Sequence, residues 1–451
     1  MNDTLFHHES DAAPASQSGE TIVAHASGAG VSAVAVIRIS GSSTRVVLEH
    51  LTGTLPVPRE ATLRRIGDID RGLVLWFPAP ASFTGEDMAE LQVHGGRAVV
   101  QAVVEAVLAV GGTRLAEPGE FARRAFENGK LDLTEVEGLA DLVSAETEAQ
   151  RRQALAQADG GLRRLYEGWR AELLKAQSLM EAGFDFSDEA DVAADAARLA
   201  GEAVEPLLHT LEAHLANHSG ERLRDGFRVV IAGPPNAGKS SILNALAKRD
   251  VAIVSEEAGT TRDVIEVHLD LGGAPVIVAD TAGLRVGGGE VEAEGMRRAV
   301  LRASSADLVL WIADARDPVP VQRERFGGVP ILAVANKADL VSEGASKPGS
   351  QPGIVVSAKT GQGLEGLIGE LGRRAAEGSE DRGASPITRT RHRVELVSIR
   401  DALKRFVNHD LDAELRAEEL RIAAHHLGRL TGRIDVEDIL GAIFSEFCIG
   451  K

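Results

Sequence analysis

Cysteine is nearly absent from the sequence, because Cys448 is the only one in 451 residues. A single cysteine excludes an internal disulfide framework and any metal site built from several cysteines. No apolar run approaches the roughly 18 residues of a membrane-spanning segment. Residues 1–20 are polar, lack the apolar centre of a signal peptide and are expected to form a flexible tail. We therefore expect a cytoplasmic protein that does not contact membranes.

Positive charge is also scarce: 49 lysines and arginines against 67 aspartates and glutamates give a net charge of −18. Such a chain repels phosphate backbones on average, so contact with a nucleic acid requires a local basic patch or a partner. No G-x-G-x-x-G fingerprint follows a predicted strand, so no tightly held flavin is expected in this chain. The length predicts about two to four domains.

Residues 21–131 have the pattern of an α+β domain. Strand-like runs cover residues 31–39 and 72–77, and valines at helical spacing predict a helix over residues 97–110. Arg38 falls on the same strand face as apolar Val34 and Val36, where a cation costs free energy unless an anion pairs with it. Spacing alone favours an arginine that snorkels at a strand end; the alternative is an arginine that binds a ligand.

Apolar stripes at helical spacing cover residues 132–218 and resume after residue 390. A capping box at Thr134 and Glu137 is predicted to open the first of these helices. Polar joints that contain glycine, at residues 218–221 and 377–383, flank a block of alternating strands and helices. We expect one all-α domain, residues 132–220 and 384–451, into which an α/β nucleotide-binding domain, residues 221–383, is inserted.

The inserted domain contains a phosphate-binding loop. Residues 233–240 match G-x-x-x-x-G-K-[ST], with a strand-like run before them and a helical pattern after them. Loop amides and the helix N-terminus would converge on phosphate oxygens. Lys239 would neutralise the β- and γ-phosphates, and Ser240 would offer its hydroxyl to Mg²⁺.

Four further motifs follow in the order of a GTPase. Asp280 to Gly283 and Asn336 to Asp339 each come directly after an apolar strand, residues 357–359 resemble the fifth guanine-contacting motif, and residues 259–263 would place a threonine on Mg²⁺. The Asp339 carboxylate can accept two hydrogen bonds from the guanine edge, which adenine cannot donate. The order of the five motifs predicts a Ras-like P-loop GTPase.

The hydrolytic step differs from that of Ras-like proteins, in which a glutamine after D-x-x-G orients the attacking water. Leu284 stands at that position and cannot do so. Arg285 and the nearby glutamates 290, 292 and 294 are candidates, although each glutamate alone fits a solvated helix face better. The side-chain oxygen of Asn236 can coordinate a monovalent cation beside the phosphates, where other GTPases use an arginine.

These residues resemble the bacterial family of tRNA-modification GTPases called MnmE or TrmE. The likeness rests on Asn236 in the loop, residues 259–263 and residues 280–285. It continues outside the GTPase in residues 36–41, 82–87, 94–96, 118–121 and 124–133, and in the C-terminal Phe-Cys-Ile-Gly-Lys of residues 447–451.

The resemblance implies a three-part protein with an N-terminal domain that binds folate and forms a homodimer, a helical domain and an inserted GTPase domain. With a flavin-dependent partner, MnmG (GidA), the family adds an aminomethyl-type or carboxymethylaminomethyl group at carbon 5 of the tRNA wobble uridine. A 5-formyl- or methylene-tetrahydrofolate supplies the carbon, FAD is held by the partner, and K⁺ activates GTP hydrolysis.

The resemblance also implies roles for individual residues. Asn236, Ser255, Glu257 and Thr260 would bind K⁺, and Ser240 and Thr261 would bind Mg²⁺. Glu292, aided by Arg285, would act in hydrolysis. Folate would contact Arg38, Glu90, Lys130 and Lys451, and for Cys448 a role in the modification stands beside that of a small apolar residue. The full set expected around GTP is Asn236, Ala237, Gly238, Lys239, Ser240, Ser241, Ser255, Thr260, Thr261, Asp280, Thr281, Ala282, Gly283, Asn336, Lys337, Asp339, Ser357, Ala358 and Lys359.

Two other functions are compatible with a GTPase of this kind. One is a regulatory switch in ribosome assembly without covalent chemistry, against which the lack of a GxxG-bearing KH domain argues. The other is a scaffold that uses GTP only to open and close.

Overall fold

The computed structural model describes residues 20–28, 30–185, 190–253, 266–280, 306–317, 319–321, 323–341, 353–377, 387–408, 411–434, 440–441, 443–444, 447 and 450. The chain divides into two compact units, Met1–Ala140 with Gly428–Lys451, and Asp141–Leu427. The three-domain division expected from the sequence stays a prediction. Within the described residues, no helix has an apolar stretch long enough to cross a bilayer.

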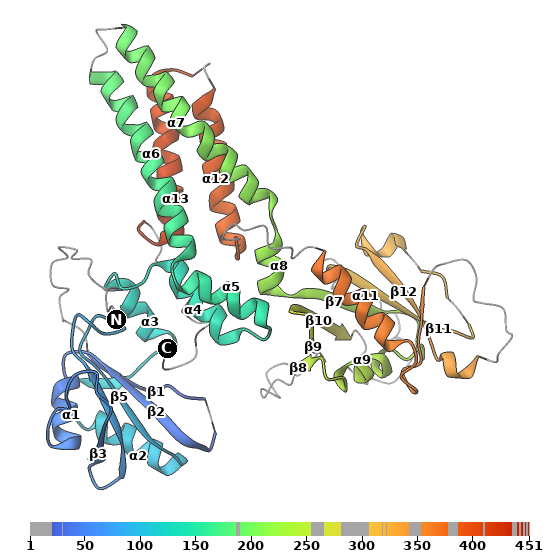
Figure 1. The fold of residues 1–451 in the computed structure, drawn as a ribbon, viewed down its shortest axis with the longest axis horizontal. Coiled ribbons are helices and arrows are strands. Elements are labelled where there is room, and N and C mark those ends of the chain that lie inside the picture. The colour runs from blue at the N-terminus through green and yellow to red at the C-terminus, as the bar shows by residue number, and fades with distance from the viewer. Residues whose placement is uncertain are drawn as a thin grey trace, which may run out of the picture. The chain divides into compact units, whose positions relative to one another are not determined.

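The first unit is built on a six-stranded sheet of order β3-β4-β5-β2-β1-β6 (Figure 1). Its only parallel neighbours among these pairs are β1 and β6. Valines of helices α1 and α2 cluster with inward-facing residues of β1, β2, β4 and β5, so both helices cover one face of the sheet. The strands are β1 (Thr21–His25), β2 (Ser32–Ser40), β3 (Thr62–Ile66), β4 (Asp70–Phe77), β5 (Met88–Gly95) and β6 (Thr113–Leu115), and the helices are α1 (Thr44–Thr52) and α2 (Arg97–Leu108).

Helices α3 (Glu120–Glu127) and α4 (Leu133–Ser144) follow the sheet. Phe444 and Phe447, from the end of the chain, pack in one apolar cluster with Ala122 of α3 and Leu133 and Val136 of α4. The last residues therefore complete the core of the N-terminal unit.

The predicted capping box at Thr134 and Glu137 is wrong by two residues. Because α4 already begins at Leu133, the cap is formed by Asp132, whose Oδ1 accepts from the Glu135 amide at 2.8 Å. The Glu135 carboxylate in turn accepts from the Asp132 amide at 2.7 Å. An aspartate caps a helix as well as a threonine does, so the sequence offers both registers.

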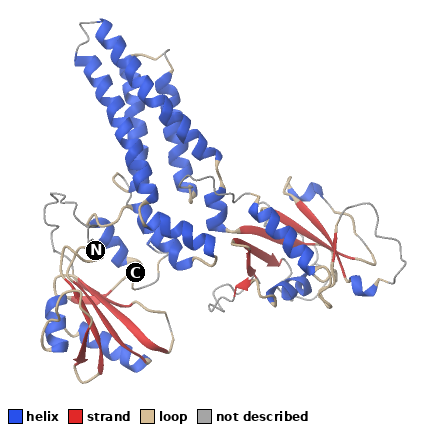
Figure 2. Ribbon diagram, in the orientation of Figure 1, coloured by secondary structure: helices blue, strands red, loops and turns tan. Residues whose placement is uncertain are grey.

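A group of packed helices forms one part of the second unit, drawn in blue in Figure 2. Tyr166 and Trp169 of α6 contact His392 of α12 and His214 of α7, respectively, with ring centroids 6.3 Å and 5.4 Å apart. These aromatic side chains are buried and form part of the helical core. The helices are α5 (Glu148–Ala158), α6 (Gly161–Asp185), α7 (Ala190–Ala216), α8 (Ser219–Asp225), α12 (Thr390–Val407) and α13 (Ala413–Thr431).

The same unit carries a seven-stranded sheet of order β13-β12-β11-β7-β10-β9-β8. Strands β10, β7, β11, β12 and β13 run parallel, and β9 runs antiparallel to β10 and β8. This order confirms the predicted Ras-like α/β domain, here called the GTPase block. Its strands are β7 (Phe227–Ala232), β8 (Ala252–Ile253), β9 (Glu266–Leu271), β10 (Ala274–Asp280), β11 (Leu308–Asp314), β12 (Ile331–Asn336) and β13 (Ile354–Val355), with helices α9 (Lys239–Ala247) and α11 (Leu364–Ala376).

Polar residues end three parallel strands of the GTPase block: Asp280 on β10, Asp314 on β11 and Asn336 on β12. The loop after β7 leaves the sheet at the same edge, because β7 is parallel to β10 and β11. The C-terminal edge of parallel strands is where α/β sheets bind their ligands. The fold thus gathers the predicted motifs at one edge.

Candidate functional site: a guanine-nucleotide site and an arginine–glutamate site

The loop between β7 and α9 depends on two glycines in left-handed conformations. Gly233 has φ of +144° and a side chain there would lie 2.1 Å from the Ile312 carbonyl oxygen. Gly238 has φ of +89°, and a side chain there would lie 2.3 Å from Nδ2 of Asn336. The motif's first and last glycines therefore let the loop approach β11 and the end of β12 closely.

Lys239 opens α9 and folds back over the loop. Its Nζ donates to the carbonyl oxygens of Gly233 at 3.0 Å and Pro234 at 2.8 Å. The positive charge is thereby held on the phosphate loop, and its role toward phosphates stays a prediction.

Ser240 and Asp280 are brought together from two motifs that lie 40 residues apart. The Ser240 hydroxyl donates to Oδ2 of Asp280 at 2.6 Å, and Asp280 is 1% exposed. A hydroxyl and a carboxylate oxygen are hard ligands of the kind that Mg²⁺ prefers. The donor set fits the predicted magnesium site.

The guanine-contacting motifs are tied to the phosphate loop by Asn336, which is buried. Its Nδ2 donates to the Ala237 carbonyl at 2.9 Å and its Oδ1 accepts from the Ala358 amide at 3.1 Å. Asp339 is exposed, and its Oδ1 accepts from the buried Ser357 hydroxyl at 2.6 Å. That contact fixes the carboxylate and leaves its second oxygen for another donor.

Lys337 links the same loops through its side chain. It adopts a left-handed backbone with φ of +66°, as Asn236 does with φ of +56°. Its Nζ donates to the Asn236 carbonyl oxygen and lies 2.9 Å from Oδ2 of Asp314. Ser241 and Lys359 of the predicted set lie exposed, at the start of α9 and in the loop after β13.

Asp314 belongs to the site although no motif contains it. Hydrogen bonds from the Arg316 side chain, helped by the Arg316 amide and Lys337, hold the pKa of the Asp314 carboxyl well below its usual range. Asp314 is therefore a permanent anion that positions Lys337. An acidic residue at the end of the strand beside β12 was the sequence signal that would have indicated it.

Several predicted residues lie outside the described part of the chain. For the nucleotide and its metals these are Ser255, Glu257, Thr260, Thr261, Thr281, Ala282 and Gly283; for hydrolysis, Arg285 and Glu292; and for the N-terminal site, Cys448 and Lys451. Their roles stay predictions.

The first unit holds a second polar site, in which Arg38 is the central residue. Arg38 on β2 stands directly opposite Glu90 on β5. Its Nε and Nη2 donate to Glu90 Oε1 at 3.1 Å and 2.9 Å, and its Nη1 donates to the Gly450 carbonyl at 3.2 Å. Its guanidinium also lies 5.8 Å from the centre of the Phe83 ring and 5.7 Å from that of Phe121. Arg38 thus has the anionic partner that a buried cation requires, rather than snorkelling.

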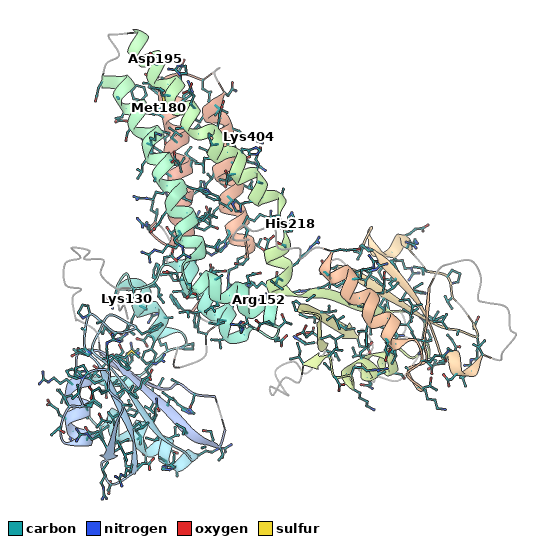
Figure 3. The ribbon with its side chains drawn as sticks, viewed as in Figure 1. Lys130, Arg152, Met180, Asp195, His218 and Lys404 are labelled. Carbon is teal, nitrogen blue, oxygen red and sulfur yellow. The ribbon has the colours of Figure 1, made fainter. Side chains whose placement is uncertain are left out.

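Lys130, labelled in Figure 3, lies against the loop that carries Phe83. Its Nζ donates to the Pro80 carbonyl at 3.1 Å, and its Cγ would lie 3.3 Å from a side chain at Gly85. The structure therefore brings together three predicted folate-contacting residues, Arg38, Glu90 and Lys130, around one loop.

A buried ionic cluster underlies this site. Glu120 is 1% exposed and accepts a hydrogen bond from Arg114 Nη1 at 2.7 Å. Arg124 donates hydrogen bonds to both Glu120 and Glu86. Burial raises the pKa of Glu120, but hydrogen bonds from Arg114, the Glu117 amide and Arg124 outweigh it and lower the pKa to about 2. Sequence reasoning did not single out this cluster, because its members come from separate segments.

Comparison with known proteins gives a consistent result over both units. The family model described as the GTP-binding protein TrmE N-terminus matches residues 21–130, and that of the MnmE helical domain matches residues 133–448. The tRNA modification GTPase MnmE of Rhodopseudomonas palustris is 52% identical over 96% of this chain and 99% of the relative. The proteins of that name from Parvibaculum lavamentivorans and Paramagnetospirillum magneticum are 52% and 53% identical, each over 96% of this chain and 100% of the relative.

Proposed function

We propose a function from one premise: this chain belongs to the MnmE family of tRNA modification GTPases. It is a GTP hydrolase that takes part in tRNA modification. The observation that carries this conclusion is the match over 96% of the chain to relatives of that name. The arrangement of Lys239, Ser240, Asp280 and Asn336 at one sheet edge supports it.

The contacts within the protein support a mode of nucleotide recognition. The loop amides and Lys239 hold the phosphates, and Asp339 accepts hydrogen bonds from the N1–H and the exocyclic amine of guanine. Asn336 joins the two loops by accepting from Ala358 and donating to Ala237, so the base and the phosphates are held in a fixed relation. Adenine would leave the Asp339 acceptor unpaired, which explains the choice of GTP.

The metal ions are held by residues of the loop and the neighbouring motifs. Ser240 and Thr261 would hold Mg²⁺, and Asp280 fixes the Ser240 hydroxyl. Bound Mg²⁺ supplies positive charge to the phosphate oxygens. The K⁺ ligands would be Asn236, Ser255, Glu257 and Thr260. Glu292, with Arg285, would orient the hydrolytic water, because the apolar side chain of Leu284 cannot do so.

The Arg38 site is proposed to bind the tetrahydrofolate that donates the carbon. A carboxylate such as Glu90 suits the amino-pyrimidinone edge of a pterin, and Arg38, Lys130 and Lys451 suit the anionic tail. The modification at carbon 5 of the wobble uridine then takes place on tRNA in the cytoplasm. It requires a homodimer of this chain and the partner MnmG, which holds FAD; Cys448 is a candidate participant.

Mass spectrometry of wobble nucleosides tests the function. A strain that lacks the chain should lose the modified uridine and regain it when the chain is supplied; unchanged modification would refute the proposal. A second measurement compares GTP turnover in K⁺ and in Na⁺. Equal rates would contradict the cation role of Asn236 while leaving the GTPase assignment intact.

A further inference from the structure

Two connections join the helices of the second unit to the GTPase block, one through α8 into β7 and the other back into α12. An arginine at each of these connections donates a hydrogen bond to the same carboxylate. Arg224, at the end of α8, donates through Nε to Asp141 Oδ1 at 2.9 Å, and Arg389, just before α12, donates through Nη2 to the same oxygen at 2.8 Å. The Asp141 and Arg389 side chains are only 13% and 9% exposed. Asp141, in the last turn of α4, therefore binds one residue of each connection.

Helix α5, which carries Arg152 in Figure 3, holds the same connections with one face. Three glutamines recur on it at helical spacing, so their side chains point the same way. Two of them donate hydrogen bonds to backbone carbonyls of α8. The third accepts a hydrogen bond from a hydroxyl in the segment before α12. The contacts are Gln150 Nε2 to the Arg224 carbonyl at 3.2 Å, Gln153 Nε2 to the Gly220 carbonyl at 3.1 Å, and Thr388 Oγ1 to Gln157 Oε1 at 3.0 Å.

The turn between α4 and α5 also reaches the GTPase block itself. Glu146 Oε2 lies 2.7 Å from Nδ1 of His268 on β9, and both side chains are 30% exposed. A side chain at Gly273, in the turn from β9 to β10, would lie 3.7 Å from Cβ of Ala149 on α5. The β9–β10 hairpin follows the segment that contains Thr261 and ends at Asp280. It is thus the part of the sheet that joins the segment of Thr261, a predicted Mg²⁺ ligand, to the motif that begins at Asp280.

We propose that the α4–α5 corner, residues 141–157, couples GTP turnover to the tRNA modification. The corner contacts the β9–β10 hairpin through Glu146 and holds both connections through Asp141 and the three glutamines. A shift of the hairpin during the GTP cycle changes the Glu146–His268 contact and reaches both connections at once. This inference rests on the proposed function, because it concerns how hydrolysis is linked to modification.

The test separates hydrolysis from modification in the full-length chain. Glu146→Gln and His268→Gln should each leave kcat and KM for GTP within about twofold, because neither side chain has a recorded contact with the described part of the nucleotide motifs. Each should lower the level of modified wobble nucleoside in a complemented deletion strain by about three- to tenfold. The exchange Glu146→His with His268→Glu should restore most of the modification. A pair this exposed contributes little to stability, so the variants should fold.

Glu148→Gln is the matched control, since Glu148 lies two residues further along and pairs within its own helix with Arg151. It should leave modification unchanged. Asp141→Asn provides a second variant, with Asp141→Glu as its conservative rescue, and thermal unfolding reports on folding. Unchanged modification in both single variants, failure of the exchange to restore it, or a parallel loss of GTP hydrolysis would overturn the coupling role. If even the wild-type chain does not support modification, the proposed function fails instead.

Discussion

The nucleotide site and the Arg38 site are assembled from the chain in different ways. Around the phosphate loop, Lys239, Lys337 and Asn336 make their described contacts largely with backbone carbonyls and amides of short, contiguous segments. In the N-terminal unit, Arg38 meets a carboxylate 52 residues away and a carbonyl 412 residues away. The first site is assembled from backbone groups of short motifs, which the fold brings together from segments up to 101 residues apart. The second is assembled from side chains, through the register of β2 against β5 and a carbonyl near the end of the chain.

The difference predicts how each site responds to change. A site made of backbone groups depends on glycines and on strand ends, so it is damaged by added atoms and by altered recognition groups. A site made of side-chain ion pairs depends on charge, so it is damaged by lost partners and by acid. Four experiments test this contrast, and they are given in decreasing order of the change expected.

Asp339→Asn should have the largest effect, and it should be confined to the choice of base. An amide donates where guanine also donates, so kcat/KM for GTP should fall by about 10³-fold or more. Xanthosine triphosphate carries a carbonyl in place of the exocyclic amine and should become the better substrate. Steady-state kinetics with both nucleotides measure the change; loss of both activities would show that Asp339 supports the loop rather than reads the base.

Gly238→Ala should damage the phosphate loop through one added methyl group. The left-handed φ and the displaced Asn336 amide together cost about 3 kcal/mol, which weakens GTP binding by about 100-fold. Titration with a fluorescent GTP analogue measures the affinity. Gly272→Ala is the control, because Gly272 has φ of +71° but nothing within 4 Å of an added side chain. Equal loss of affinity in both variants would remove the role assigned to close approach.

The Glu120 cluster should make the N-terminal unit sensitive to acid. The pKa of Glu120 is lowered from 4.5 to about 2 in the folded chain, so its stabilisation is fully present above pH 4.5 and is lost as the pH falls through 2. The shift corresponds to about 3 kcal/mol at neutral pH. Hydrogen exchange of α3 amides at several pH values should show protection declining with acid, and Glu120→Gln should flatten that dependence.

The neighbouring Glu117→Gln serves as the control for that experiment, because the Glu117 side chain is mostly exposed and its carboxylate forms a surface ion pair with Arg123. Its pH dependence should match that of the wild-type chain. A wild-type unit whose α3 protection is the same at pH 3 and pH 7 would contradict the assigned pKa shift.

Arg38→Ala should have the smallest effect on stability, about 2 kcal/mol, because it leaves Glu90 partly enclosed without its cation. It should abolish binding of 5-formyltetrahydrofolate in calorimetry and leave GTP turnover unchanged. Arg45→Ala, which removes an exposed ion pair on α1, should alter neither quantity. If Arg38→Ala retains folate binding, the pair with Glu90 is structural and the ligand lies elsewhere.

The same contrast explains what the sequence could predict. Motif spacing indicated the phosphate loop, Asp280, Asn336 and Asp339, because each of these motifs is contiguous in the sequence. The Ser240–Asp280 and Asn336–Ala237 contacts appear only in the structure. Asp314 was not predicted as a site residue, because only the order of the strands places it beside Lys337. Spacing alone gave Arg38 the less specific interpretation, since its partner is set by the register of β2 against β5. The cap of α4 was misplaced because Asp132 and Thr134 both suit the position.

The Asp141 oxygen that Arg224 and Arg389 share has a consequence for the architecture of the protein. Because Arg224 and Arg389 both reach it, the chain leaves the helices and returns to them at neighbouring points. When the chain leaves and re-enters a domain at neighbouring points, a second domain can be inserted or deleted there without changing the path of the chain through the first. We therefore expect that the GTPase block can be removed without unfolding the helices. Replacing residues 226–387 by a short glycine-rich linker would yield a chain in which the helices and the N-terminal unit can be studied without the GTPase block.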